Sequence, residues 1–226
     1  MMDELKRMAA VAALDEIRDG MVLGLGTGST ASHFIRELGA RVRSGLRVVG
    51  IPTSEDSQRL AQEVGVPLTT LRAHPEIDVT VDGADEVSAA LDLIKGLGGA
   101  LVREKIVAHA SERVIIVVDE TKLVDKLGRR TPIPVEVVPF AVDSVGAQLL
   151  RWGGEGKVRQ KDGRPFVSDN GNFVLDWGHG IIEEPHIFEK QIKAITGVVD
   201  SGIFARVADL VIVATASAIH KLHREV

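Results

Sequence analysis

The sequence predicts an α/β protein: a Rossmann-like domain with a mostly parallel sheet and a second, smaller α+β domain of the ferredoxin-like kind. Helical and extended periodicity alternate along the first half of the chain. The strand VIIVV, residues 114–118, is apolar on both faces, as in sheets covered by helices on both sides. Beyond Lys122, prolines and glycine-rich turns separate shorter elements. We therefore expect residues 1–127 and 203–226 in the first domain and 128–202 in the second.

The first domain opens with an amphipathic helix over residues 3–20, in which Leu5, Met8, Ala12 and Ile17 share a stripe and Gly20 marks the end. Strands and helices then alternate with short connections, as βαβ units require. The expected strands are 21–26, 46–51, 77–82 and 113–119, and the expected helices are 29–45, 54–65 and 100–110.

The second domain is expected to follow the order strand, helix, strand, strand, helix, strand. Three prolines punctuate TPIPVEVVPF, helices are predicted over 141–152 and 185–195, and GGEGK and DNGN form turns between short strands. The last segment, ADLVIVATASAIHKL, returns to the strand and helix style of the first half. We expect it to rejoin the first sheet as a strand and a helix.

Composition excludes several classes of function. A net charge of -5 and a pI near 5.8 argue against a nucleic-acid partner, which would require a basic face. No apolar run approaches the roughly 20 residues that cross a bilayer, and MMDELKRMAA lacks the apolar block of a secretory signal. We expect a cytoplasmic protein with no membrane partner. Because the sequence contains no cysteine, disulfides, thiolate nucleophiles and cysteine-bound metals are excluded.

GLGTGST, residues 24–30, lies between a predicted strand and a predicted helix. Its glycines allow backbone amides to approach a ligand, and the helix terminus and the hydroxyl groups of Thr27, Ser29 and Thr30 complete a phosphate cradle. A tight turn with a capping hydroxyl group is the alternative. The segment lacks the third glycine of the dinucleotide motif and the lysine of a P-loop, so it favours a small phosphorylated metabolite over a nucleotide.

VTVDGADEV, residues 79–87, places Asp82 at the carboxyl end of a strand, the edge at which open α/β sheets bind ligands. Asp85 follows after a turn that Gly83 permits. The two carboxylates are candidates for binding a metal, hydrogen-bonding sugar hydroxyls or exchanging protons. An Asx turn that caps the next segment remains the alternative.

KGLGGALVREK, residues 95–105, is a third glycine-rich turn that leads into a helix. Lys95 and amides near Gly98 and Gly99 are suited to stabilise an oxyanion. Glu104 stands between Arg103 and Lys105, and by itself this pattern indicates a surface charge.

Six blocks in this order closely resemble the type A ribose-5-phosphate isomerases: GLGTGST, VDGADEV, KGLGGALVREKIVA, VDETKLVDKLG, PIPVEVVPFA and SDNGNFVLD. VVDSGIFARVADLVIVA extends the likeness almost to the end of the sequence. The resemblance implies that D-ribose 5-phosphate and D-ribulose 5-phosphate are interconverted through an enediolate, in the non-oxidative branch of the pentose phosphate pathway. It implies neither a metal nor an organic cofactor.

The resemblance also assigns roles to residues. Glu104 matches the family's base, which reverses its interpretation as a surface charge; Asp82 and Asp85 match residues for the sugar hydroxyls and ring opening; Lys95 matches the lysine that stabilises the enediolate oxygen. The family's assembly implies a homodimer or a dimer of dimers. The implied substrate contacts are Thr27, Gly28, Ser29, Thr30, Gly83, Ala84, Gly96, Leu97, Gly98, Lys122 and Lys6.

One position departs from the family pattern, because Leu97 interrupts the run of glycines after Lys95. A side chain there is expected to narrow the loop or displace an amide.

Two other functions compete with the isomerase. A sugar-phosphate sensor would need a DNA-binding module, for which the roughly 20 residues before GLGTGST are too few. A sugar-phosphate deaminase or a lactonase is expected to use a histidine base, and the three glycine-rich blocks contain no histidine.

Overall fold

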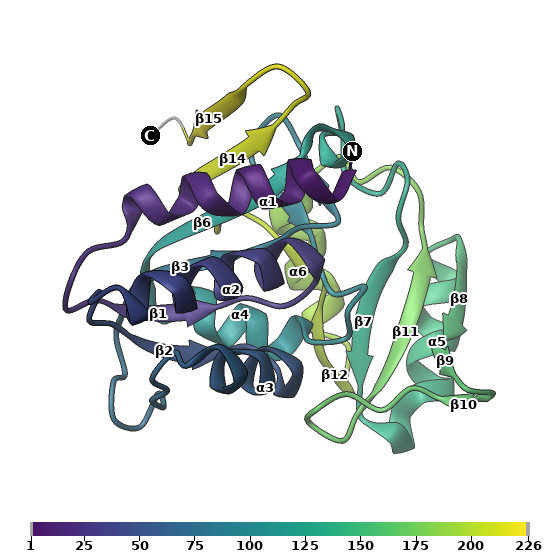
Figure 1. The fold of residues 1–226 in the computed structure, drawn as a ribbon. Helices are drawn as coiled ribbons and strands as arrows, with labels where there is room; N and C mark the ends of the chain where they lie inside the picture. The colour runs from purple at the N-terminus through teal and green to yellow at the C-terminus, as the bar shows by residue number, and fades with distance from the viewer. Residues whose placement is uncertain (1, 225–226) are drawn as a thin grey trace. The chain divides into compact units, whose positions relative to one another are not determined.

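The computed structural model describes residues 2–224, which form two compact units (Figure 1). Residues 2–84, 103–122 and 207–224 make up the first unit, and residues 85–102 and 123–206 make up the second. The expected division placed residues 85–102, 123–127 and 203–206 in the first domain, whereas the structure groups these segments with the second unit. Among residues 2–224, no helix combines the length and the apolar character needed to cross a membrane.

The first unit is built on a six-stranded sheet with the order β15-β14-β6-β3-β1-β2. Every neighbouring pair is parallel except β14 and β15. This confirms the mostly parallel α/β sheet. The strands are β1 (Val22–Leu25), β2 (Val49–Pro52), β3 (Ile77–Asp82), β6 (Ser111–Asp119), β14 (Leu210–Ala214) and β15 (Ile219–His223).

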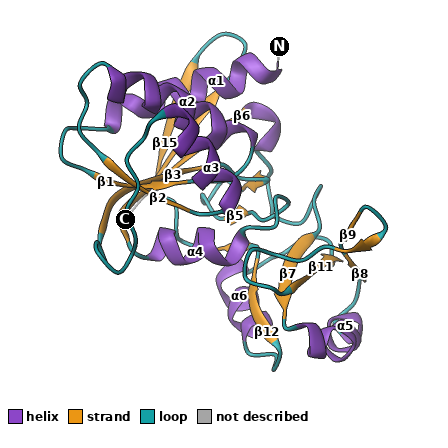
Figure 2. Cartoon of the chain, turned by 60° about the horizontal axis from the view of Figure 1, so that its bottom comes forward, coloured by secondary structure: helices purple, strands orange, loops and turns teal. Residues whose placement is uncertain are grey.

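Helices cover both faces of this sheet, as Figure 2 shows for β1, β2 and β3. Helices α1 (Met2–Ala13), α2 (Ser29–Arg43) and α3 (Glu55–Val64) lie on one face, where Phe34 and Leu38 pack against Leu23 and Val79. Helix α4 (Leu101–His109) lies on the other, with Val107 in a cluster with Ile51 and Ile77. Burial on both faces explains why the strands are almost uniformly apolar.

Two helix ends of the first unit differ in how well the sequence predicts them. Helix α1 ends at Ala13 and continues as the 3-10 turn η1 (Leu14–Glu16), so the expected end at Gly20 is wrong. Helix α3 begins where expected, because Ser54 Oγ accepts a hydrogen bond from Ser57 N, and it ends at Gly65 in the left-handed conformation.

The C-terminal segment forms a strand pair rather than the expected strand and helix. Strands β14 and β15 are antiparallel, with Ala214 opposite Ile219. Thr215 closes the turn: its Oγ1 donates to the Ala218 carbonyl oxygen and accepts from the Ala218 amide, both at 3.0 Å. The helix-forming residues of this segment are therefore overridden by the turn and the sheet edge.

The second unit contains a four-stranded antiparallel sheet with the order β12-β7-β11-β8. Its chain order is strand, helix, strand, strand, helix, strand, which confirms the ferredoxin-like α+β prediction. Both helices pack on the face that buries Trp177 and Val135. The elements are β7 (Ile133–Val137), α5 (Val142–Arg151), β8 (Glu155–Val158), β11 (Phe173–Gly178), α6 (Pro185–Lys193) and β12 (Val198–Ser201).

The second unit also holds two small sheets that the sequence did not predict, because two-residue strands carry no periodic signal. One is the hairpin β9 (Gln160–Lys161) with β10 (Arg164–Pro165), and the other has the order β13-β5-β4. The remaining elements of this unit are β4 (Glu86–Val87), β5 (Leu93–Ile94), β13 (Ile203–Phe204) and the 3-10 turn η3 (Pro139–Ala141). A further 3-10 turn, η2 (Glu120–Lys122), belongs to the first unit.

Candidate active site

The predicted site residues fall in both units, and each is described within its own. In the first unit, the GTGST loop follows β1, Asp82 ends β3, and Lys122 follows β6 in η2. Because β1, β3 and β6 are adjacent parallel strands, their carboxyl ends lie at one edge of the sheet. This is the edge at which open α/β sheets bind ligands.

The GTGST loop ends at the N-terminus of α2, where Gly28 is the capping residue. Gly28 has a φ of 101°, so any side chain would be strained there although the space around the residue is open. Gly28 and Ser29 are exposed, and Thr30 is half-buried. The exposed amides at the positive end of a helix suit a phosphate group.

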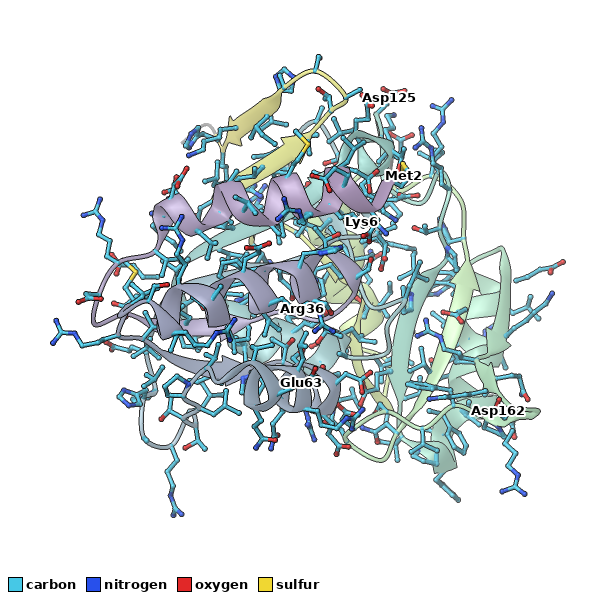
Figure 3. All side chains as sticks on the ribbon, viewed as in Figure 1. Met2, Lys6, Arg36, Glu63, Asp125 and Asp162 are labelled. Carbon is cyan, nitrogen blue, oxygen red and sulfur yellow. The ribbon has the colours of Figure 1, made fainter. Side chains whose placement is uncertain are left out.

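Lys6, on α1, lies beside this loop (Figure 3), and its Nζ donates to Ser29 Oγ at 3.0 Å. A second contact joins the same two helices, since His33 Nε2 lies 2.9 Å from Asp3 Oδ1. The hydrogen bond with His33 holds the pKa of Asp3 below its usual value. The structure therefore brings together two of the predicted phosphate contacts, Lys6 and Ser29.

Thr27 points into the protein. Its Oγ1 lies 2.7 Å from Thr53 Oγ1, 2.8 Å from Ser54 Oγ and 3.0 Å from Ser57 Oγ, and these three residues are buried. Ser57 Oγ also donates to the Gly26 carbonyl oxygen at 2.7 Å. The Thr27 hydroxyl group therefore holds the loop in place from within. We call Thr53, Ser54 and Ser57 the hydroxyl cluster.

The hydroxyl cluster was not predicted from the sequence, because the segment SEDSQRLAQEVG was interpreted only as a helix. The available signal was a second serine, Ser57, three residues after the cap Ser54, preceded by Thr53 at the end of a strand. Three small buried hydroxyl side chains close together require hydrogen-bond partners, and here the GTGST loop supplies them.

Asp82 is 2% exposed, and its Oδ1 accepts hydrogen bonds from Gly83 N at 2.7 Å and Thr27 N at 3.0 Å. Gly26 makes this approach possible, since a Cβ atom at Gly26 would lie 2.2 Å from Asp82 Oδ1. Asp82 therefore orders the start of its own turn through the Gly83 amide and also fixes the GTGST loop. Gly83 and Ala84 are half-buried beside it.

Glu104 is 4% exposed on α4, so its interpretation as a surface charge is wrong. Leu101, Lys105 and Ala108 are also buried, which places Glu104 on the buried face of the helix at spacings of three and four residues. This spacing was the signal that the flanking charges obscured. Burial of a carboxylate costs free energy unless the group has hydrogen-bond or charged partners. A buried glutamate at this position therefore indicates a specific structural or functional role.

In the second unit, Asp85 and its neighbour Glu86 bind backbone amides. Asp85 Oδ2 accepts a hydrogen bond from Leu97 N at 3.0 Å. Glu86 is 1% exposed; Oε1 accepts from Arg130 N and Thr131 N at 2.6 and 2.8 Å, and Oε2 accepts from Gly128 N at 2.7 Å. Glu86 is thus occupied in fixing the 128–131 loop. Within residues 2–224, no group of three or more histidines and carboxylates is placed to bind a metal.

Lys95 is 4% exposed and follows β5. Its amide donates to the Gly202 carbonyl oxygen at 2.8 Å, and its Nζ lies 5.5 Å from the centre of the Phe204 ring. A Cβ atom at Gly202 would lie 2.1 Å from the Lys95 carbonyl oxygen, so only glycine fits there. The segment SGIF, residues 201–204, therefore fixes the backbone that carries Lys95.

Residues 96–99 form a turn in which Gly99 N donates to the Gly96 carbonyl oxygen at 2.9 Å. Gly96 and Gly99 have φ of 101° and 82°, a region that favours glycine. Leu97 is 43% exposed, and its amide is bound by Asp85. Because the Gly99 amide closes the turn, it is a poorer oxyanion donor than the sequence suggested.

Comparisons with known proteins show which proteins the chain is similar to. The family model for ribose 5-phosphate isomerase A (phosphoriboisomerase A) matches residues 49–218. A curated ribose-5-phosphate isomerase A from Gloeobacter violaceus is 51% identical to the chain over 222 residues, which cover 98% of this chain and 96% of that protein.

Solved structures show the same similarity. A structure of D-ribose-5-phosphate isomerase in complex with phospho-erythronic acid is 42% identical, with a TM-score of 0.97 over 99% of this chain and 100% of that chain. The ribose 5-phosphate isomerase A structure from Methanocaldococcus jannaschii is 45% identical, with a TM-score of 0.93 over 97% of this chain and 98% of that chain.

Proposed function

We propose that this chain, which belongs to the ribose 5-phosphate isomerase A family, uses Glu104 as the base of its reaction. The reaction is the interconversion of D-ribose 5-phosphate and D-ribulose 5-phosphate. The observation that carries the assignment is the burial of Glu104 on α4 between two charged neighbours.

The chemistry requires a base at the second carbon of the open-chain sugar. The Glu104 carboxylate removes the proton from C2, the electron pair forms the C1–C2 double bond, and negative charge develops on O1. Return of the proton to C1, with transfer of a proton from O2 to O1, completes the ketose. Asp82 and Asp85 bind the sugar hydroxyls and assist ring opening and the transfer between oxygens.

Lys95 stabilises the developing negative charge on oxygen. A buried ammonium group in a fixed position is more effective than a mobile surface lysine, because it needs no reorganisation when the charge forms. The contacts of the Lys95 backbone with Gly202 support this role. Gly96, Leu97 and Gly98 border the same oxygen.

The phosphate group binds at the GTGST loop, where residues 28–30 begin α2 and the Lys6 ammonium group contacts Ser29. It is remote from the reacting carbons, so its binding energy orients the sugar without taking part in the chemistry. Lys122, Gly83 and Ala84 are further proposed contacts.

Replacement of Glu104 tests the assignment. Glu104→Gln keeps the size of the side chain but cannot accept the proton, so we expect kcat to fall roughly 10²-fold or more. The Michaelis constant should change little. The measurement is the formation of ribulose 5-phosphate, with a thermal melt to show that the buried substitution leaves the protein folded.

The matched control is Glu112→Gln, at an exposed position on β6 that has no proposed role. It should isomerise at the rate of the parent. If Glu104→Gln is as fast as the parent, the base must be sought at Asp82 or Asp85. A parent protein that fails to isomerise ribose 5-phosphate would overturn the reaction itself.

We also propose a homodimer or a dimer of dimers in the cytoplasm, on the strength of the family likeness. Sedimentation equilibrium at micromolar concentration would reject the assembly if it found only a monomer.

A further inference from the structure

Arg159 contacts the loop that follows Lys95. Its Nη1 donates to the carbonyl oxygens of Gly96 and Leu97 at 2.9 and 3.0 Å. The two carbonyl groups are consecutive in the chain, so one guanidinium group fixes the orientation of two successive peptide planes.

Asp176, on β11, holds this guanidinium group by two hydrogen bonds. Arg159 Nε donates to Asp176 Oδ2 at 2.9 Å, and Nη2 donates to Oδ1. The two side chains are only 13% and 25% exposed. A paired, planar contact of this kind sets direction as well as distance, which a single ammonium group does not.

Phe166 lies against both Arg159 and the 96–99 turn. The Arg159 Cζ atom lies 5.7 Å from the centre of the Phe166 ring. A Cβ atom at Gly99 would lie 2.3 Å from Phe166 Cζ, so the same ring packs directly against the far end of the 96–99 turn. We call Arg159, Asp176 and Phe166 the arginine clamp.

The clamp determines where the loop amides point. No peptide bond in the described chain is cis, and in a trans peptide the N–H group points away from the carbonyl group. With the Gly96 and Leu97 carbonyl groups directed at Arg159, the amides of Leu97 and Gly98 point to the opposite side. The Leu97 amide confirms this direction, because it reaches Asp85 Oδ2 at 3.0 Å.

We propose that Arg159 is a positioning residue of the isomerase, and that it holds the Gly98 amide toward the substrate oxygen on which charge develops. Asp176 acts through Arg159, and Phe166 acts both through Arg159 and by its own contact with Gly99. This inference rests on the proposed function. Two successive backbone amides that point the same way are a recurrent anion-binding arrangement. Here the Asp85 carboxylate binds the Leu97 amide, and the Gly98 amide is the one proposed to face the substrate.

The inference also explains why Leu97 is tolerated in a loop that is otherwise rich in glycine. The backbone of Leu97 supplies both contacts, one to Asp85 and one to Arg159, while its side chain is 43% exposed. The Leu97 side chain therefore interrupts neither of these two backbone contacts.

The first test replaces the clamp residues one at a time. Arg159→Lys keeps the charge but loses the planar fork, and Asp176→Asn keeps the size but weakens the hold on Arg159. We expect kcat to fall about 10-fold or more in both, since loss of one oxyanion donor lowers kcat by about 10²–10³. The Michaelis constant for ribose 5-phosphate should stay within about twofold, because the phosphate binds elsewhere.

A second readout separates positioning from simple loss of structure. Phospho-erythronic acid carries a carboxylate where the enediolate carries its oxygens, so its affinity should fall in parallel with kcat/KM. In Arg159→Ala, added methylguanidinium should restore part of the lost kcat, whereas methylammonium should not. Arg164→Ala, at an exposed arginine on β10, is the matched control and should behave as the parent.

Three outcomes would overturn the inference. They are an unchanged kcat in Arg159→Lys and Asp176→Asn, a loss of rate that only follows the fraction of unfolded protein, and a loss that appears in KM alone. None of them affects the parent's isomerase activity or the effect of Glu104→Gln, so failure of the clamp and failure of the proposed function are distinguishable.

Discussion

The two aspartates of the DGAD segment each hold the backbone of a glycine-rich loop. Asp82 accepts the Thr27 amide of the GTGST loop, and Asp85 accepts the Leu97 amide of the KGLGG loop. A carboxylate that orders a loop and also has a proposed substrate contact cannot be removed without affecting both. Loss of activity in Asp82→Ala or Asp85→Ala therefore does not by itself measure a proton-transfer step.

The first prediction concerns Ser57 in the hydroxyl cluster. Ser57→Ala removes the donor to the Gly26 carbonyl oxygen and a neighbour of Thr27 Oγ1, so the GTGST loop should lose its fixed position. We expect the KM for ribose 5-phosphate to rise several-fold, with kcat within about twofold. The free energy of unfolding should fall by about 1–2 kcal/mol, because a buried carbonyl group loses its partner. Steady-state kinetics and urea unfolding measure both effects.

The control for this prediction is Ser44→Ala. Ser44 also donates its hydroxyl group to a carbonyl oxygen, that of Ala40, but it is exposed at the far end of α2. Its KM should equal that of the parent. An unchanged KM in Ser57→Ala as well would show that the loop does not depend on the cluster.

The sequence predicts the position of a residue best when that residue lies at the end of a regular helix or strand. Asp82 at the end of a strand and Gly28 before a helix follow from periodicity alone. The partners of Thr27 and Glu86 do not, because Thr27 meets residues 26 to 30 positions away and Glu86 meets residues 42 to 45 positions away. Contacts at such separations depend on tertiary packing, which a local pattern does not encode.

At the scale of elements, the long βαβ units were predictable and the shortest strands were not. The C-terminal hairpin was also mispredicted, for a different reason. ATASAIHKL contains good helix formers, yet Thr215 closes a turn and Ile219 returns along β14. Local propensity amounts to only a few tenths of a kcal/mol per residue, so pairing with a sheet edge outweighs it.

The turn of this hairpin gives the second prediction. Thr215→Val keeps the branched shape but removes both side-chain hydrogen bonds to Ala218. We expect the free energy of unfolding to fall by about 1 kcal/mol, because the turn loses two hydrogen bonds. Urea unfolding and hydrogen exchange at Ile219 to His223 would measure it.

Thr196→Val is the matched control, since Thr196 is exposed and ends no hairpin. Its stability should stay within about 0.5 kcal/mol of the parent. If Thr215→Val unfolds at the same urea concentration as the parent, the strand pairing rather than the turn decides this structure.

At the scale of the first unit, Glu16 joins three distant parts of the chain. Its Oε1 accepts from Lys221 Nζ on β15 at 2.8 Å, and its Oε2 accepts from Arg113 Nη2 on β6 at 3.2 Å. The hydrogen bond from Lys221, followed by that from Arg113, lowers the pKa of Glu16 against the opposing effect of burial.

The lowered pKa predicts how stability depends on pH. A carboxyl group with a depressed pKa in the folded state stabilises the protein above its unfolded pKa, about 4.3, and loses this contribution as the pH falls through the folded value. Relative to Glu16→Gln, the parent should be more stable by roughly 1 kcal/mol between about pH 5 and pH 7. The difference should shrink below about pH 4.3, as urea unfolding at a series of pH values would measure.

Glu63→Gln serves as the control. Glu63 on α3 lies 3.9 Å from Arg36 on α2, and both side chains are more than half exposed (Figure 3). Such a pair contributes little, so this variant should match the parent at every pH. A stability difference in Glu16→Gln that persists undiminished at pH 3 would contradict the electrostatic explanation.

The order of the strands in the sheet has a consequence for synthesis on the ribosome. β6 ends at Asp119, but its neighbour β14 begins only at Leu210, about 90 residues later. At about 5–20 residues per second, the apolar edge of β6 emerges several seconds before its partner is translated. A nascent chain stalled in this interval presents the VIIVV strand with one edge unpaired, which is a target for chaperones and a template for aggregation.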